Sequence, residues 1–213
     1  MTDHHAPCFL DGLSTYLRNN GSLYIPHAFD SFDIYSRLSL QLPPIPAAGA
    51  RHSKDVVRAT PPIAAHGRRS AQPAHLDFAF IRTGERNTVT DGTPLQGLRI
   101  AHVRIIFKLP HHYPVHSPHP LAYIEWFTPL HRFDEDAGLF TVTRSTRMQQ
   151  PYGEIITVDR IVRSCHLIPK FGREIDSRWK ADNVTELCKS YYVNPYFDTH
   201  TFCMLRAQQP GCI

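Results

Sequence analysis

The 213-residue sequence predicts a mainly β (α+β) fold, built on a small bent sheet or a small barrel. Three observations predict this class. Residues 98–109 alternate apolar and polar side chains over the length of a long strand. Residues 155–158 and 161–168 are two apolar, β-branched runs around a short polar break, a pattern typical of two strands joined by a tight turn. Helical periodicity is confined to two short stretches near the ends, which does not fit a βαβ fold.

The first segment, residues 1–42, is expected to hold a helix and an edge strand. Apolar side chains recur at helical intervals over residues 9–18, and the Asn-Asn-Gly at 19–21 is a typical helix stop. Residues 38–42 alternate leucine with serine and glutamine, and the Pro-Pro that follows closes the strand.

The second segment, residues 43–75, is rich in proline, alanine and basic residues and has few large apolar side chains. Such a composition buries little surface, so we expect a linker or a loop draped over the core. Residues 51–75 contain five basic residues and a single acidic residue, Asp55, so this stretch has a local charge of +4. Because a phosphate contact needs only charge and reach, these cations are the candidate nucleic-acid-binding residues. They are Arg51, Lys54, Arg58, Arg68 and Arg69.

The third segment, residues 76–206, is expected to be the β-rich core domain, followed by a tail at 207–213. Strands are predicted over residues 76–81, 98–109, 121–127, 139–144, 155–158 and 161–168. Alternation in the second of these strands places His102, Arg104 and Lys108 on a face turned to water. The strand at 139–144 is expected to form a hairpin with 121–127 across an acidic turn.

The C-terminal part of this core is expected to contain one helix and a closing strand. The helix is predicted over residues 184–192, with Asn183 and Glu186 spaced as in a capping box. The closing strand is predicted over residues 200–205.

A histidine-rich loop is the weak candidate for a metal site. Zinc requires three or four converging nitrogen or sulfur ligands. Neither a cysteine pair nor an HExxH motif accompanies the loop, so a polar loop stiffened by prolines is the favoured interpretation. The histidines are His111, His112, His116 and His119.

The cysteine content and the hydropathy of the sequence indicate the cellular compartment and whether the chain enters a membrane. The five cysteines are an odd number without a CxxC pair, and the N-terminus MTDHHAPC lacks the apolar core of a signal peptide. Reduced thiols and an intracellular location are therefore expected. No apolar run approaches the roughly 20 residues that span a bilayer, so no membrane association is predicted.

Several stretches of the sequence resemble segments of one protein family, and they occur in the same order as in that family. They are FDIYSRLSLQLPPIP, HGRRSAQPAHLDFAFIR, GTPLQGLRIAHVRIIFKLP, HPLAYIEWFTPL, IVRSCHLIPKFG and NVTELCKSYYVNPYFDTHTF. Over residues 9–205 the chain is similar to the carboxy-terminal, non-catalytic region of Plavaka-type transposases of basidiomycete fungi, related to the Kyakuja, Dileera and Zisupton elements. The stretch IITVDRIVRSCHLIP also resembles bromo-adjacent and SH3-like barrels.

The resemblance implies a non-enzymatic accessory module of a mobile-element protein, located in the nucleus and contacting DNA, chromatin or a nuclear protein. The catalytic carboxylates of such transposases lie outside this region, and none is carried over to this chain. Neither a cofactor nor a small-molecule substrate is predicted. Two alternatives stay open: a metal-dependent nuclease or hydrolase that uses the histidine-rich loop, and an inactive relic of a mobile element.

Overall fold

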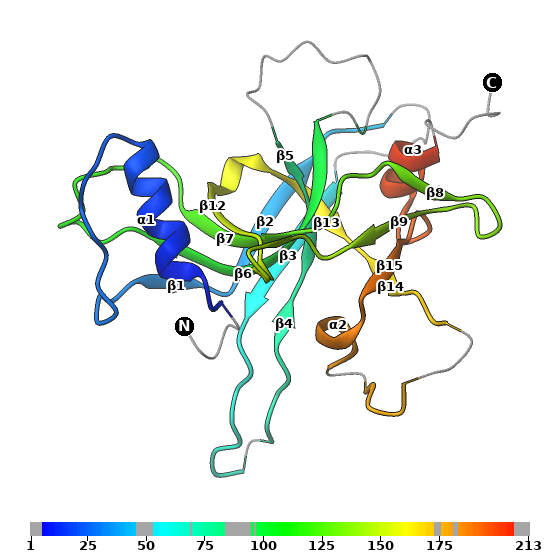
Figure 1. Ribbon diagram of the computed structural model, residues 1–213, viewed down its shortest axis with the longest axis horizontal. Coiled ribbons are helices and arrows are strands. Elements are labelled where there is room, and N and C mark those ends of the chain that lie inside the picture. The colour runs from blue at the N-terminus through cyan, green and yellow to red at the C-terminus, as the bar shows by residue number, and fades with distance from the viewer. Residues whose placement is uncertain are drawn as a thin grey trace.

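The computed structural model describes residues 6–45, 53–68, 70–83, 95, 97–172, 176–180 and 183–206 (Figure 1). Strands make up 43% of the chain and helices 14%, which confirms the mainly β class. The helices are α1 (Phe9–Asn19), α2 (Val184–Leu187) and α3 (Thr199–Arg206), with a 3-10 turn η3 (Val158–Arg160). The strands are β1 (Asp33–Tyr35), β2 (Arg37–Leu42), β3 (Ser53–Thr60), β4 (His75–Leu76), β5 (Phe78–Arg82), β6 (Leu98–Lys108), β7 (Leu121–Trp126), β8 (Arg132–Asp134), β9 (Leu139–Thr143), β10 (Thr146–Arg147), β11 (Gln150–Pro151), β12 (Gly153–Thr157), β13 (Ile161–Cys165), β14 (Leu167–Pro169) and β15 (Ser190–Val193).

The main sheet is antiparallel, with the order β12-β7-β6-β5-β13 and with β1 paired to the end of β6. Its two outer strands are consecutive in sequence and are joined only by η3. The four Cα steps from Thr157 to Ile161 span at most about 14 Å, whereas a flat sheet would hold these strands about 19 Å apart. The sheet is therefore strongly bent, and β12 and β13 act as one strand that turns a corner.

The bent-sheet alternative is thus confirmed, and the barrel alternative is wrong. The outer strands β12 and β13 do not pair with each other, and no sheet within the described residues closes into a barrel. For the same reason the two apolar runs around the break at 159–160 are not a hairpin. Each run pairs with a different neighbour, β7 or β5.

The prediction that one face of the longest strand is exposed to water is wrong. Strand β6 covers residues 98–108, close to the prediction, but both of its faces are buried from Ile100 to Phe107. His102 and Arg104 are 1% and 2% exposed, and of the three polar side chains assigned to water Lys108 alone reaches it. Alternation identified the strand, but segments from the C-terminal half cover its polar face.

The segment expected as a linker or draped loop contributes strand β3. This strand lies between β2 and β4 in a three-stranded sheet, in which β2 is an edge strand as expected. Val57 and Ala59 are fully buried, and the Asp55 carboxylate accepts hydrogen bonds from the Ser164 backbone N (2.6 Å) and from its Oγ (2.8 Å). Two small apolar side chains and one acid hold β3 on the core, which composition alone did not predict.

The part of this segment that follows β3, described at residues 61–68 and 70–74, forms a projecting hairpin arm between β3 and β4. The arm extends from the body at the bottom of Figure 1. An isolated bridge between Ile63 and Gln72 joins its two sides.

The C-terminal part departs most from the sequence prediction. Strands β14, β15, β9 and β8 form a second sheet, and β9 pairs with β8 and β15 instead of forming a hairpin with β7. Helix α2 stops at Leu187, and β15 begins three residues later within the expected helix. The expected strand at 200–205 is helix α3, because the Asp198 carboxylate accepts a hydrogen bond from the Thr201 N (2.8 Å) and caps its first turn.

Helix α1 confirms the predicted N-terminal helix and packs its apolar face on the sheet. Phe9, Leu13 and Leu17 are buried against Tyr123 and Ile155 in one core cluster. None of the described helices combines the length and the apolar character that crossing a bilayer requires.

Two glycines, Gly153 and Gly12, lie beside Tyr123, and we expect substitution by alanine to have opposite effects on stability at the two positions. A Cβ at Gly153 would overlap the Tyr123 hydroxyl and lie 2.7 Å from ring carbons, whereas the nearest atom to a Cβ at Gly12 is 3.5 Å away. We expect Gly153→Ala to lower the free energy of unfolding by about 1–3 kcal/mol through overpacking. The matched control Gly12→Ala should raise it by about 0.5–1 kcal/mol, since alanine favours a helix interior. Urea unfolding of both variants measures the free energy of unfolding. An equal change in the two variants would contradict the close packing of Gly153 on Tyr123.

Candidate functional site

A row of exposed cations lies on the outer face of strands β2 and β3. The register pairs Arg37 with Arg58 and Gln41 with Lys54, so these side chains share one face of the ladder. Leu38 and Leu40 point to the opposite face and pack on the core. The two-residue period that buries the leucines therefore places the cations in solvent.

These cations form no side-chain ion pair in the part of the chain that the structure describes, although the Asp77 carboxylate accepts a hydrogen bond from the Arg58 backbone N at 2.8 Å. Arg37, Lys54 and Arg58 form no ion pair with a described carboxylate. Like charges placed directly across two strands destabilise the pair, and Arg37 and Arg58 occupy such positions. An anion bound between them would remove this repulsion.

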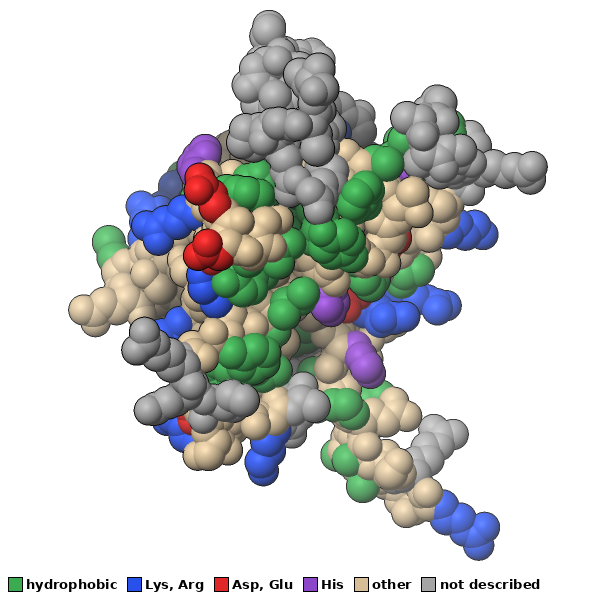
Figure 2. Space-filling view, turned by 90° about the vertical axis from the view of Figure 1, so that its right-hand side faces the viewer, with side chains coloured by type: hydrophobic (Ala, Val, Ile, Leu, Met, Phe, Trp, Pro, Cys, Tyr) green, Lys and Arg blue, Asp and Glu red, His purple; other side chains and the backbone are tan. Residues whose placement is uncertain are grey.

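The projecting arm adds a cation at its tip. Gly67 adopts a left-handed conformation there (φ +59°), and the following Arg68 is exposed. We call Arg37, Lys54, Arg58 and Arg68 the cationic ribbon. In Figure 2 the arm stands away from the body at the lower right and ends in blue side chains. Arg51 and Arg69 of the predicted set lie outside the described residues.

Arg37 is the member of the ribbon that the sequence prediction missed, although a usable signal was present. The alternation that turned Leu38, Leu40 and Leu42 inward required Arg37 to point outward. Its position opposite Arg58 depended on the pairing of β2 with β3, which was not predicted.

The four histidines of the candidate metal loop are all exposed. The loop is anchored by Tyr113, whose hydroxyl donates to Asp30 Oδ2 at 2.6 Å. The ring of His112 lies against Tyr24 and Tyr113. Among the described residues, no three His, Cys, Asp or Glu side chains converge in a manner that would hold a metal ion.

A partly buried ion network connects the main sheet to the C-terminal part: Arg104 and Glu125 are buried, whereas Glu186 is 35% exposed. A register shift between Val103 and Ile105 leaves Arg104 as the extra residue of a β-bulge. Its guanidinium donates to Glu125 Oε2 from Nε (2.9 Å) and Nη2 (2.7 Å). It also donates to both carboxylate oxygens of Glu186, at 2.6 and 2.9 Å. Sequence reasoning assigned Glu186 to a helix cap, because 82 residues separate it from Arg104.

Arg144 completes the network and balances its charge. It lies 3.5 Å from Glu125 and 3.3 Å from Glu186, and it donates to the Thr185 carbonyl. Two arginines and two glutamates have no net charge. Buried ion pairs of this kind fix geometry more than they add stability, so we assign the network a positioning role.

Two titratable groups of the network are displaced from their ordinary pKa values. Burial and the nearby Arg104 charge hold the pKa of His102 well below its usual range, and its Nε2–H donates to the Leu76 carbonyl. Burial alone would raise the pKa of Glu186, but the hydrogen bonds and charge of Arg104 lower it to about 2. At neutral pH His102 is therefore uncharged and Glu186 is ionised.

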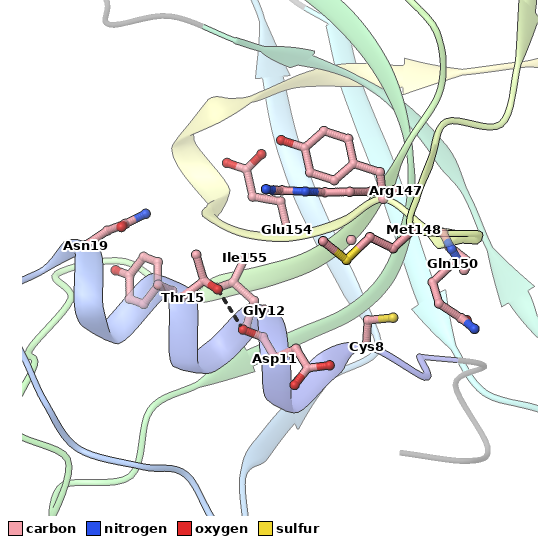
Figure 3. Close-up of a pocket in the computed structure, with 14 residues that line it drawn as sticks. Cys8, Asp11, Gly12, Thr15, Asn19, Arg147, Met148, Gln150, Glu154 and Ile155 are labelled. Carbon is pink, nitrogen blue, oxygen red and sulfur yellow. Dashed lines mark hydrogen bonds between the residues drawn. The ribbon is translucent and has the colours of Figure 1, made fainter.

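A cavity of about 560 Å³ lies between α1 and the hairpin β10–β11 (Figure 3). Cys8, Asp11 and Thr15 line it from the helix side, and Arg147 and Glu154 line the other side. The volume would suit a small molecule. Burial and the charge of Asp11 raise the pKa of the Cys8 thiol, so the cavity does not present an activated sulfur nucleophile.

The turn beside this cavity has an unfavourable backbone conformation. Met148 and Gln149, its central residues, have φ values of 50° and 64°. Tight hairpins normally place Asn-Gly at such positions. The double substitution Met148→Asn with Gln149→Gly should therefore raise the free energy of unfolding by about 1–2 kcal/mol. Urea unfolding measures this, and an unchanged stability would contradict the left-handed turn.

The pKa of Glu186 predicts a pH-dependent stability. Because its folded-state pKa is lowered, the contribution of Glu186 is present above its ordinary pKa near 4.5 and is lost as pH falls toward about 2. Glu186→Gln should cost roughly 1–2 kcal/mol at pH 7 and flatten the stability curve between these values. Urea unfolding from pH 2.5 to 7 tests this, with Glu135→Gln, an exposed acid, as the control. Curves for Glu186→Gln and wild type that run parallel would contradict the assignment.

Comparisons with protein-family models, with curated proteins and with solved structures found no match. The resemblance to Plavaka-type transposases therefore stays a prediction from the sequence. The functional proposal rests on the geometry of the cationic ribbon.

Proposed function

We propose that this protein is a non-enzymatic accessory module that binds nucleic acid through the cationic ribbon. The observation that carries the proposal is the pairing of Arg37 opposite Arg58 on an exposed strand face, where neither guanidinium forms an ion pair with a described carboxylate. Lys54 and Arg68 extend the positive charge along the strand and the arm. Phosphates at regular spacing would neutralise such a row.

The non-enzymatic part of the proposal is supported by the surroundings of Glu125, Glu186 and Cys165. Glu125 and Glu186 are held by arginines in the partly buried network. Burial raises the pKa of the Cys165 thiol, and His166 follows it without a hydrogen bond between the two side chains in the described part. The proposal also includes a nuclear location and an origin in a fungal transposase, both of which come from the sequence resemblance.

The alternative of a metal-dependent nuclease or hydrolase has weaker support. It needs the histidine-rich loop to present several ligands to one point, and the four histidines lie exposed without a described metal cluster. The alternative of an inactive relic predicts that no polyanion binds selectively to the ribbon. The relic alternative differs from the proposal in a single binding experiment.

Fluorescence anisotropy with a labelled 20-base-pair duplex of arbitrary sequence is the test. Four phosphate contacts predict a slope of log affinity against log salt of about −3.6, or roughly a hundredfold loss between 50 and 200 mM salt. The variant Lys54→Ala/Arg58→Ala/Arg68→Ala should reduce the slope to about −1.

A matched control removes three exposed cations elsewhere, Arg18→Ala/Arg132→Ala/Arg147→Ala. These positions lie on α1, β8 and β10, away from the ribbon. Equal losses in the two triple variants would show that binding follows net charge and would overturn the assignment to the ribbon. An absence of binding at 50 mM salt, to this duplex and to single-stranded DNA alike, would overturn the nucleic-acid function.

A further inference from the structure

Two pairs of exposed aromatic side chains flank the start of α3, His166 with Phe197 and Tyr196 with Phe202, and we call these four residues the aromatic ledge. The rings of His166 and Phe197 are stacked, with centroids 5.5 Å apart and planes inclined by 7°. Tyr196 and Phe202 lie beside each other with centroids 5.9 Å apart. Tyr196 is 62% exposed, Phe197 is 52% exposed and Phe202 is 38% exposed. Large aromatic surfaces in water mark interaction sites when they occur together.

The ledge is held in position by polar contacts. The Asn194 side chain binds His166 Nδ1 at 3.1 Å, and its Oδ1 accepts from the Tyr196 N at 2.9 Å. Asp198, next to Phe197, accepts from the buried Arg163 at 2.6 Å. These contacts fix the His166 ring and the backbone that carries Tyr196 and Phe197, which lowers the ordering cost of binding at the ledge.

The ledge borders one end of the cationic ribbon. His200, in α3, contacts the carbonyl of Pro43 through Nε2 at 3.1 Å. Pro43 directly follows β2, and the ladder there pairs Leu42 with Ser53 and Gln41 with Lys54. Figure 1 shows α3 beside the end of β2, on the side of the molecule opposite α1. A strand of nucleic acid that follows the ribbon past Lys54 therefore arrives at the ledge.

We propose that the ligand is a single-stranded nucleic acid, with phosphates on the cationic ribbon and unpaired bases stacked on Phe197 and Tyr196. This proposal rests on the proposed function and narrows it. Bases inside a duplex already stack on each other and leave no face for the ledge, whereas unpaired bases stack readily on aromatic side chains beside a positively charged groove. A peptide of acidic residues alone would satisfy the cations but has no aromatic rings to stack on the ledge.

Three labelled probes separate charge from stacking: dT15, an abasic 15-mer with the same phosphates, and a 15-base-pair duplex. At about 50 mM salt dT15 should bind about tenfold or more tightly than the abasic strand. Phe197→Ala should weaken dT15 binding about tenfold and leave the abasic strand unchanged. A labelled rU15 shows whether RNA is bound in the same way.

Phe29→Ala is the matched control, because Phe29 also stacks on a histidine, His27, with planes inclined by 2°. It is 81% exposed in the loop after α1, on the other side of the molecule, and should leave dT15 affinity unchanged. Since both phenylalanines are exposed, neither variant should change thermal unfolding.

The outcomes distinguish this proposal from the proposed function. Equal binding of all three probes, or an unchanged dT15 affinity in Phe197→Ala, would overturn the single-strand proposal and leave nucleic-acid binding intact. Binding of a 15-residue poly-glutamate that equals dT15 and falls in Phe197→Ala would overturn it in favour of a protein partner. An absence of binding to every probe would overturn both proposals.

Discussion

The structure depends on the burial of one arginine charge, that of Arg104. A guanidinium that is 2% exposed is tolerated only when carboxylates and hydrogen bonds replace its water. Glu125 on the neighbouring strand provides one carboxylate, and Glu186 at α2 provides the other. The charge therefore fixes the C-terminal part against the main sheet. It also explains why both faces of β6 are buried despite a sequence with one polar face.

Arg163 repeats this arrangement at the other end of the C-terminal part. It is 2% exposed and pairs with Asp198, which in turn caps α3. The two buried arginines are each matched to carboxylates from a distant segment. The arginines of the cationic ribbon are not matched in this way within the described residues, although they lie directly opposite each other.

The bent sheet connects this electrostatic pattern to the proposed interface. The corner between β12 and β13 brings β13 across to β5 and beneath β3. Asp55 then holds β3 to Ser164, so the inner face of the ribbon is buried and its outer face is exposed. The same strand, β13, carries Arg163 and leads into His166. One bent strand thereby positions both the ribbon and the aromatic ledge.

The sequence by itself determined part of the local backbone: the alternation over 98–109 and 38–42 identified β6 and β2, and the spacing over 9–18 identified α1. It also identified Lys54, Arg58 and Arg68 as exposed candidates, because their segment has almost no acids. Only the tertiary structure decided which groups meet. Periodicity reports the geometry of neighbouring residues, whereas Glu186 lies 82 residues from Arg104 and Asp55 lies 109 residues from Ser164. Pairings over such separations arise from sheet bending and burial, which leave no local pattern in the sequence.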